Sequence, residues 1–96
     1  MKVILIDDEP LARSIVNEYL QKHPELDIVA ECNDGFEGVK AIQQHQPDLI
    51  FLDIQMPGKT GFDMLAELDR APHVIFTTAY DEYALKAFEV NALDYL

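Results

Sequence analysis

Two groups of acidic residues end short apolar segments in this chain of 96 residues. Asp7 and Asp8 follow the apolar residues 3–6, and Asp53 follows the apolar residues 49–52. An unbroken run of four apolar residues between polar or turn residues is typical of a strand buried on both faces. A carboxylate at the exit of such a strand lies at the edge of a sheet, where open α/β folds bind ligands. These three carboxylates are the first candidates for chemistry.

The elements that must position these acids alternate between strands and helices. Five short apolar segments predict strands, at residues 3–6, 28–30, 49–52, 74–76 and 92–96. Segments with helical spacing or helix-capping residues lie between them, at residues 10–23, 34–46, 62–68 and 81–88. Strands that lack period-two alternation and alternate with helices indicate right-handed βαβ units and a parallel sheet. We predict one doubly wound α/β domain of the flavodoxin-like class with strand order 2-1-3-4-5, truncated before a final helix.

Composition limits the possible partners of the chain. Lys and Arg number 7 against 18 Asp and Glu, which gives a formal net charge of -11. Binding of nucleic acid or of an anionic membrane by this chain is therefore not expected, since both need basic patches. With a single cysteine, Cys32, an internal disulfide and a Cys-rich zinc site are excluded. No apolar run approaches the roughly 20 residues of a membrane span, and the N-terminus does not read as a signal peptide, so we expect a cytoplasmic protein.

The predicted topology brings the three carboxylates together. In the order 2-1-3-4-5 the first and third strands are neighbours, roughly 4.8 Å apart, so Asp7, Asp8 and Asp53 leave the sheet side by side. Three adjacent carboxylates repel one another, and a hard divalent cation relieves that repulsion. Mg²⁺ suits such a site because it takes few carboxylates and keeps several waters. We expect Asp8 as a direct ligand, Asp7 acting mostly through water, and the backbone carbonyl of Gln55 as a further ligand.

The same arrangement gives Asp53 a specific chemical role. A carboxylate can act as a nucleophile and hold a phosphoryl group as a mixed anhydride, with a metal and hydrogen-bond donors stabilising the transition state. The fourth strand ends in Thr77, Thr78 and Ala79 at the same edge, where a hydroxyl can bind a phosphoryl oxygen. Each feature alone has a plainer explanation, such as the β-propensity of threonine or favourable acid at a helix N-terminus. Their convergence on one edge makes Asp53 a candidate phosphoacceptor.

Several blocks of the sequence resemble the receiver domain of two-component response regulators. They are ILIDDEP, LIFLDIQMPGKTGFDML, VIFTTAY and AFEVNALDYL, and together they span nearly the whole chain. The last block, with the residues before it, is similar to regulators that carry a LytTR-type DNA-binding output domain. The resemblance implies a phosphorelay protein that is not an enzyme in the usual sense and that controls transcription in its full-length form.

The resemblance also implies roles for individual residues. A sensor histidine kinase would donate a phosphoryl group to Asp53, Thr78 matches the switch hydroxyl, and Tyr95 matches the switch aromatic. The Mg²⁺ ligands would be Asp7, Asp8, Asp53 and the backbone carbonyl of Gln55.

The sequence departs from the family pattern near its C-terminus. The family places a lysine, followed by proline, shortly after the position of Tyr95, and this sequence ends at Leu96. We therefore expect residues 1–96 to be a receiver domain without the C-terminal end of the fold and without an output domain. The apolar surface that a final helix would cover leads us to expect a homodimer or strand exchange.

Three alternatives remain open at this point. An aspartyl-phosphate hydrolase would use a second Asp two residues after the nucleophile, where this chain has Gln55. A flavodoxin-like cofactor carrier would have a first loop rich in Gly, Ser and Thr, where this chain has acids. The third alternative is a receiver-like module that acts by protein contacts, including dimerisation, without phosphorylation.

Overall fold

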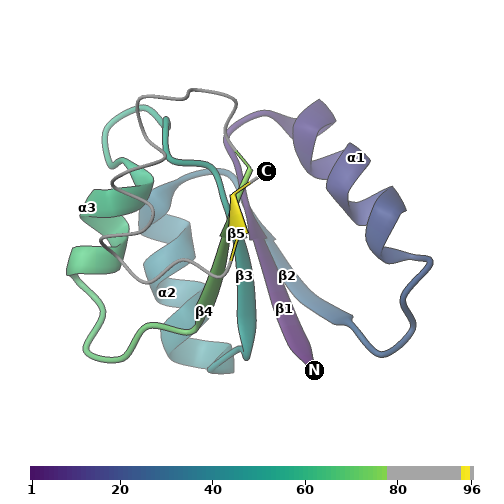
Figure 1. The fold of residues 1–96 in the computed structure, drawn as a ribbon. Helices are drawn as coiled ribbons and strands as arrows, with labels where there is room; N and C mark the ends of the chain where they lie inside the picture. Colours follow the sequence, from purple (N-terminus) through teal and green to yellow (C-terminus); the bar gives the residue numbers. More distant parts are fainter. Residues whose placement is uncertain (78–93, 96) are drawn as a thin grey trace.

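The computed structural model describes residues 1–77, 94 and 95, and a parallel five-stranded sheet lies at its centre (Figure 1). The strands are β1 (Lys2–Ile6), β2 (Asp27–Cys32), β3 (Leu49–Leu52), β4 (His73–Phe76) and β5 (Asp94–Tyr95). The helices in the described part are α1 (Pro10–Leu20), α2 (Gly35–His45) and α3 (Gly61–Ala66). The sheet order β2-β1-β3-β4-β5 confirms the predicted doubly wound α/β topology. The helix expected at residues 81–88 lies outside the described residues.

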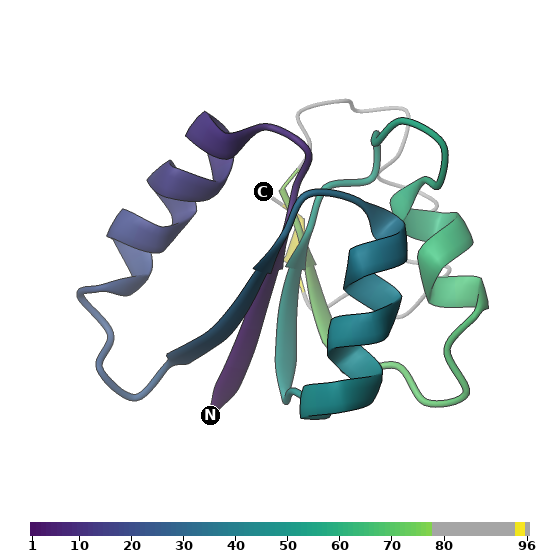
Figure 2. The ribbon, with the colours of Figure 1, turned by 180° about the vertical axis from the view of Figure 1, so that it is seen from behind.

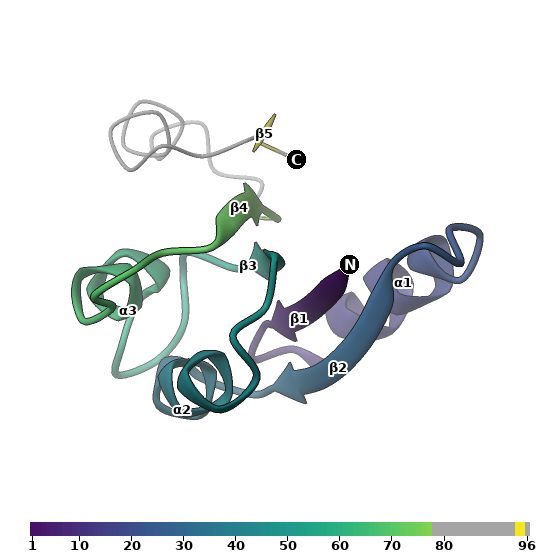
Figure 3. The same ribbon diagram turned by 90° about the horizontal axis from the view of Figure 1, so that it is seen from below.

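Helices cover the sheet on both faces, as the right-handed crossovers of a parallel sheet require. Figures 2 and 3 show α1 on one face, with α2 and α3 together on the other. The strand side chains accordingly divide into two buried clusters. The cluster on the α2 and α3 side includes Ile4, Ile6, Ile50 and Leu52, whereas Val3, Leu5, Leu49 and Phe51 belong to the cluster beside α1.

The central strands are buried along their whole length, as their unbroken apolar sequences predict. No residue of β3 is more than 7% exposed, and Val3 to Ile6 of β1 are at most 1% exposed. The edge strand β2 is longer than predicted, and its first five residues stay exposed or half-buried. Its last residue, Cys32, is buried in the core, as expected for a small apolar side chain.

The apolar residues of the helices are only partly directed at the sheet. In α1, Pro10 occupies the first turn as predicted, and Leu20 is buried, but Leu11, Ile15 and Tyr19 are more than 60% exposed. In α2, Ile42 is buried, whereas Phe36 is 62% exposed. Phe36 is therefore not a core residue, unlike Ile42 of the same helix. No helix within the described residues combines the length and the apolar character that a membrane crossing needs.

The register of the strands sets which residues leave the sheet together. Ile6 pairs with Leu52, and Leu52 in turn pairs with Phe76. Because all three strands are parallel, the residues that follow these pairs leave the sheet at its carboxyl edge. The edge therefore carries Asp7 from β1, Asp53 from β3 and Thr77 from β4.

Candidate functional site

Three carboxylates meet at the carboxyl edge of the sheet, as the sequence predicts. Asp7, Asp8 and Asp53 each offer a carboxylate oxygen, and these oxygens lie within 4.8 Å of one another. Asp7 is 9% exposed, and the other two are half-buried. The cluster is thus open enough to admit an ion and sheltered enough for charge to matter.

Backbone hydrogen bonds extend the sheet by one residue at this edge. The amide of Asp53 donates to the carbonyl of Ile6 at 2.9 Å, and the amide of Asp7 donates to the carbonyl of Cys32 at 3.1 Å. The amide of Thr77 donates to the carbonyl of Leu52 at 3.0 Å. The site is therefore built on the ends of hydrogen-bonded strands, which hold its side chains at fixed spacing.

Asp7 and Asp53 each begin a tight turn with the same local hydrogen bond. The amide of Glu9 donates to Oδ1 of Asp7 at 2.9 Å, and the amide of Gln55 donates to Oδ1 of Asp53 at 3.1 Å. An aspartate that accepts from the amide two residues on is a common turn device. In both residues Oδ1 accepts this bond, which restricts the orientation of the carboxylate.

The electrostatics of the cluster disfavour three negative charges. Burial raises the pKa of Asp53 to about 7, with the negative charge of Asp7 as the second cause. Burial also raises the pKa of Asp7, to which the charges of Asp8 and Glu9 add, while the hydrogen bond from the Glu9 amide partly offsets the rise. A site in which carboxylates hold protons for lack of positive charge is suited to a divalent cation.

Gly61 anchors the loop that follows Asp53. A Cβ on Gly61 would lie 2.8 Å from the carbonyl oxygen of Asp53 and 2.9 Å from Cα of Ile54, so a side chain does not fit. The amide of Gly61 donates to the carbonyl of Ile54 at 2.8 Å. Next to it Thr60 caps α3 in a reciprocal capping box with Asp63. The start of α3 is thereby fixed against the end of β3.

Lys59 makes two side-chain contacts beside this loop that sequence reasoning did not identify. Its ammonium group forms an ion pair with Glu67 and lies 4.8 Å from the ring centroid of Phe36. The contact with Lys59 accounts for the exposed position of Phe36, because the ring faces the β3–α3 loop. The spacing of residues 36, 59 and 67 gives no sequence signal of such a contact.

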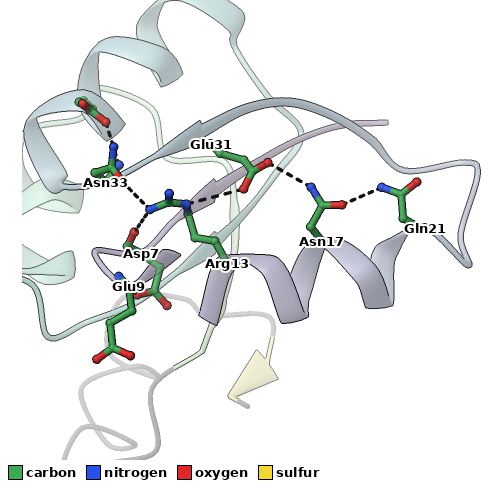
Figure 4. A network of polar contacts seen from close by, with 8 residues as sticks. Asp7, Glu9, Arg13, Asn17, Gln21, Glu31 and Asn33 are labelled. Carbon is green, nitrogen blue, oxygen red and sulfur yellow. Dashed lines mark hydrogen bonds and ion pairs between the residues drawn. The ribbon is translucent and has the colours of Figure 1, made fainter. Parts of the chain in front are cut away.

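Arg13 makes a second set of contacts that sequence reasoning missed (Figure 4). Its Nη1 donates to the backbone carbonyl of Asp7 at 2.6 Å and to Oδ1 of Asn33 at 2.7 Å. Its Nε lies 3.6 Å from a carboxylate oxygen of Glu31. Arg13 is half-buried, like Ala12 and Val16 of the same helix, but the type and spacing of a long charged residue do not by themselves indicate such a position.

The other predicted site residues are placed as follows. Gln55 is exposed and lies directly after Asp53 and Ile54, at the start of the loop. Thr78 lies outside the described residues, and for Tyr95 the description covers the strand β5 but not the side chain. The roles expected for Thr78 and Tyr95 therefore stay predictions.

The donor set fits a hard divalent cation. Carboxylate oxygens are the ligands that Mg²⁺ prefers, and a small number of them leaves coordination positions for water or a phosphoryl group. Histidine and cysteine, the ligands of softer metals, do not belong to the cluster among the described residues. The backbone of Cys32 lies next to Asp7 across the sheet, but burial raises the pKa of the Cys32 thiol to about 11 and keeps it protonated.

Comparison with known proteins agrees with this geometry. The family model described as the response regulator receiver domain matches residues 3–96. The transcriptional regulatory protein BtsR of Escherichia coli is 48% identical over 98 residues, which cover the whole chain and 41% of BtsR. The sensory transduction protein LytT of Enterococcus faecalis is 46% identical, again over the whole chain and 41% of that protein.

Solved structures show the same likeness. The crystal structure of the response regulatory domain of protein mrkE from Klebsiella pneumoniae superposes with a TM-score of 0.89 at 35% identity, covering 100% of this chain and 81% of that one. The chain spans less than half the length of the curated relatives named above. The fold, the acidic edge and these similarities together show that the chain belongs to the response regulator receiver domain family of two-component systems.

Proposed function

We propose that Asp53 accepts a phosphoryl group from a sensor histidine kinase, the class of enzyme that phosphorylates receiver domains. The observation that carries this proposal is the meeting of Asp7, Asp8 and Asp53 within 4.8 Å at the carboxyl edge of the sheet. Asp53 is the nucleophile because it ends the central strand β3 and has neighbouring carboxylates from β1 beside it. The domain is thus a phosphoacceptor and not an enzyme that turns over an external substrate.

In the reaction an oxygen of the Asp53 carboxylate attacks the phosphorus atom of a phosphohistidine. A new P–O bond forms as the P–N bond breaks, and the histidine nitrogen leaves with the electron pair of that bond. Attack requires the ionised carboxylate, whereas burial and the charge of Asp7 raise the pKa of Asp53 to about 7. The site therefore needs positive charge nearby to hold Asp53 in its reactive form.

Asp7, Asp8 and Asp53 would hold Mg²⁺, with the backbone carbonyl of Gln55 as a further ligand. Bound there, the ion would supply positive charge that neutralises the carboxylates and the phosphoryl oxygens in the transition state. The hydrogen bonds from Glu9 and Gln55 fix the Asp7 and Asp53 carboxylates.

The response to phosphorylation is proposed to run from Thr78 to Tyr95. Thr78 follows Thr77, whose amide is bonded to the end of β3, and Tyr95 ends β5 beside Phe76 of β4. A hydroxyl that moves toward the phosphoryl group, coupled to the aromatic ring, would shift the population of two conformations. Relatives that are named transcriptional regulatory proteins support a DNA-binding output domain in a longer form of the protein, and the relative LytT supports an output domain of the LytTR type. The longer form is proposed to act in the cytoplasm.

The hydrolase alternative lacks support in the structure. The residue two positions after Asp53 is Gln55, whose amide side chain cannot act as a general acid or base. The described acids nearest to Asp53 are Asp7 and Asp8, which form the proposed metal site. Homodimerisation or strand exchange remains a prediction, which measurements of the solution mass over a range of protein concentrations would test. The absence of direct nucleic-acid binding also remains a prediction, which a titration with DNA would test.

Mass spectrometry after incubation with Mg²⁺ and a small phosphodonor, such as acetyl phosphate, tests the proposal. We expect the wild type to gain the mass of one phosphoryl group when Mg²⁺ is present. No gain is expected when a chelator removes Mg²⁺, and none is expected in Asp53→Asn. Asp69→Asn, which removes an exposed carboxylate beyond α3, is the matched control and should be phosphorylated normally. A gain of the same size in Asp53→Asn would contradict the assignment of the phosphoacceptor.

A further inference from the structure

Arg13 connects the acidic site to the start of α2. Its Nη1 donates at 2.6 Å to the backbone carbonyl of Asp7 and at 2.7 Å to the side-chain oxygen of Asn33 (Figure 4). The amide of Asn33 in turn donates to Glu37 at 2.8 Å, in the first turn of α2. One guanidinium nitrogen thus ties the loop that carries the acids to the β2–α2 connection on its other side.

The Nε atom of Arg13 is buried on the side of the guanidinium group next to Glu31. The Arg13 side chain is 14% exposed, and Glu31 lies 3.6 Å from its Nε. That distance suits an ion pair, but Nε has no hydrogen-bond acceptor among the described residues. Glu31 is held in place by Asn17, which Gln21 contacts in turn. The strong, short bonds of Arg13 are therefore the two made by Nη1, which face the site.

The carbonyl that Arg13 holds has a special position in the chain. It belongs to the peptide bond between Asp7 and Asp8, and a peptide unit is planar. Fixing the direction of this carbonyl fixes the plane that contains the Cα atoms of both acidic residues, and both carboxylate side chains branch from those two atoms. A hydrogen bond from a charged donor is well suited to this task because it is stronger than a neutral one.

We propose that Arg13 is a positioning residue for the metal site, acting through the peptide plane between Asp7 and Asp8. This inference rests on the proposed function, since it assumes that these acids hold Mg²⁺. Arg13 does not touch the ion. It keeps two ligands of the ion in the orientation that places their oxygens near Asp53.

Geometry and charge predict opposite effects for a substitution of Arg13. If Arg13 acted merely as a nearby cation, removing its charge would strengthen Mg²⁺ binding, because like charges repel. If it positions the ligands, removing it weakens Mg²⁺ binding in spite of the charge change. Arg13→Lys further separates the effect of charge from the effect of ligand positioning, because lysine keeps the positive charge but lacks the planar guanidinium group.

The test is the Mg²⁺ dissociation constant, measured by isothermal titration calorimetry at fixed pH and ionic strength. We expect Arg13→Met to weaken binding about tenfold, as is usual for residues that orient metal ligands, and Arg13→Lys to weaken it by a smaller factor. Arg70→Met is the matched control, because Arg70 is exposed and precedes β4 at the opposite end of the sheet. It should leave binding unchanged or slightly tighter. Binding in Arg13→Met that equals or exceeds that of the wild type would overturn the inference.

Amide hydrogen exchange without metal provides a second measurement. The amide of Glu9 is bonded to Oδ1 of Asp7, and we expect it to exchange at least several-fold faster in Arg13→Met than in the wild type. Asn33→Ala, an exposed substitution that keeps Arg13, should produce a smaller change in the same direction. Unchanged Glu9 exchange in both variants would count against positioning, whereas a wild type that binds no Mg²⁺ would refute the proposed function itself.

Discussion

The β1–α1 loop and the β3–α3 loop bring carboxylates to the same edge of the sheet, but they are held there in different ways. Asp7 is fixed by hydrogen bonds, from Arg13 to its carbonyl and from Glu9 to its carboxylate. The loop after Asp53 also makes hydrogen bonds, but it depends in addition on close packing, because Gly61 lies against the backbone of Asp53 and Ile54. The β1–α1 loop depends on the guanidinium donor of Arg13, whereas the β3–α3 loop depends on the absence of a side chain at position 61.

This difference predicts which property each loop controls. A hydrogen bond to one carbonyl can be lost with little change in packing, so variants of Arg13 should affect ligand geometry more than stability. Backbone packed against backbone has no flexible side chain that could yield to an added atom. Variants of the β3–α3 loop should therefore affect stability first, and phosphorylation as a consequence.

The largest effect on stability is expected for Gly61→Ala. The new methyl group would meet the Asp53 carbonyl at 2.8 Å and force the end of β3 and the start of α3 apart. We expect a loss of about 3 kcal/mol in the free energy of unfolding, measured by urea denaturation followed by circular dichroism.

Gly35→Ala is the matched control for this substitution. Its new methyl group would meet the side chain of Lys59, at 2.9 Å from Cδ and 3.0 Å from Cγ, which can rotate away, and at 3.1 Å from Cβ, which would have to shift by a few tenths of an ångström. We expect a change within about 1 kcal/mol, because alanine also favours helix at this position in α2. Equal losses in the two variants would show that backbone packing does not distinguish Gly61.

Asp53→Asn should stabilise the fold in a pH-dependent way. An ordinary aspartate has a pKa of 3.8, whereas the pKa of Asp53 is about 7 in the folded protein. Between these two pH values the folded state therefore binds more protons than the unfolded state. Stability of the wild type therefore falls as pH rises from about 4 to about 7, and the variant escapes this loss. The shift corresponds to at most about 4 kcal/mol, and solvent screening reduces it to about 1–2 kcal/mol at pH 8.

Urea denaturation at pH 4.5 and pH 8, without divalent metal, provides the measurement. Asp69→Asn, a matched loss of an exposed carboxylate, should change stability about equally at the two pH values. Adding Mg²⁺ at pH 8 should narrow the gap between the wild type and Asp53→Asn, since the ion binds the folded wild type more tightly. A gap that is the same at both pH values would contradict the raised pKa.

Sequence patterns were sufficient for the strands and for the acids that follow them. Leu49–Leu52 and residues 3–6 are apolar on both faces, and the parallel topology leaves one edge where Asp7, Asp8 and Asp53 can meet. The prediction succeeds because strand order and register decide it, and neither depends on how individual side chains pack. Helix-capping residues at position 33 or 34 also predicted the start of α2, and the structure selects Asp34, whose side chain accepts from the Glu37 amide.

The contacts of Arg13 and Lys59 could not be derived in the same way. Each joins elements that are far apart in sequence, and long charged side chains on helices and loops usually extend into solvent. Their partners depend on the distance between α1 and the β2–α2 connection, or between α2 and α3, which follows from packing of the whole core. The exposed position of Phe36 has the same origin, because its ring lies beside Lys59 and not on the sheet.

The smallest effect, and the one that most directly probes the packed loop, is expected for Lys59→Met. Methionine keeps most of the aliphatic chain, which matters because the Lys59 side chain is 16% exposed, but it removes the ion pair with Glu67 and the cation near Phe36. We expect a loss of about 0.5–1 kcal/mol in the free energy of unfolding at low ionic strength.

Salt separates this contribution from packing. Lys40→Met, at an exposed position of α2, is the control for the loss of one positive charge from an acidic protein. The extra loss in Lys59→Met should shrink by about half or more in 1 M NaCl, where exposed ion pairs are screened. An extra loss that salt does not change would assign the role of Lys59 to the contacts of its half-buried aliphatic chain.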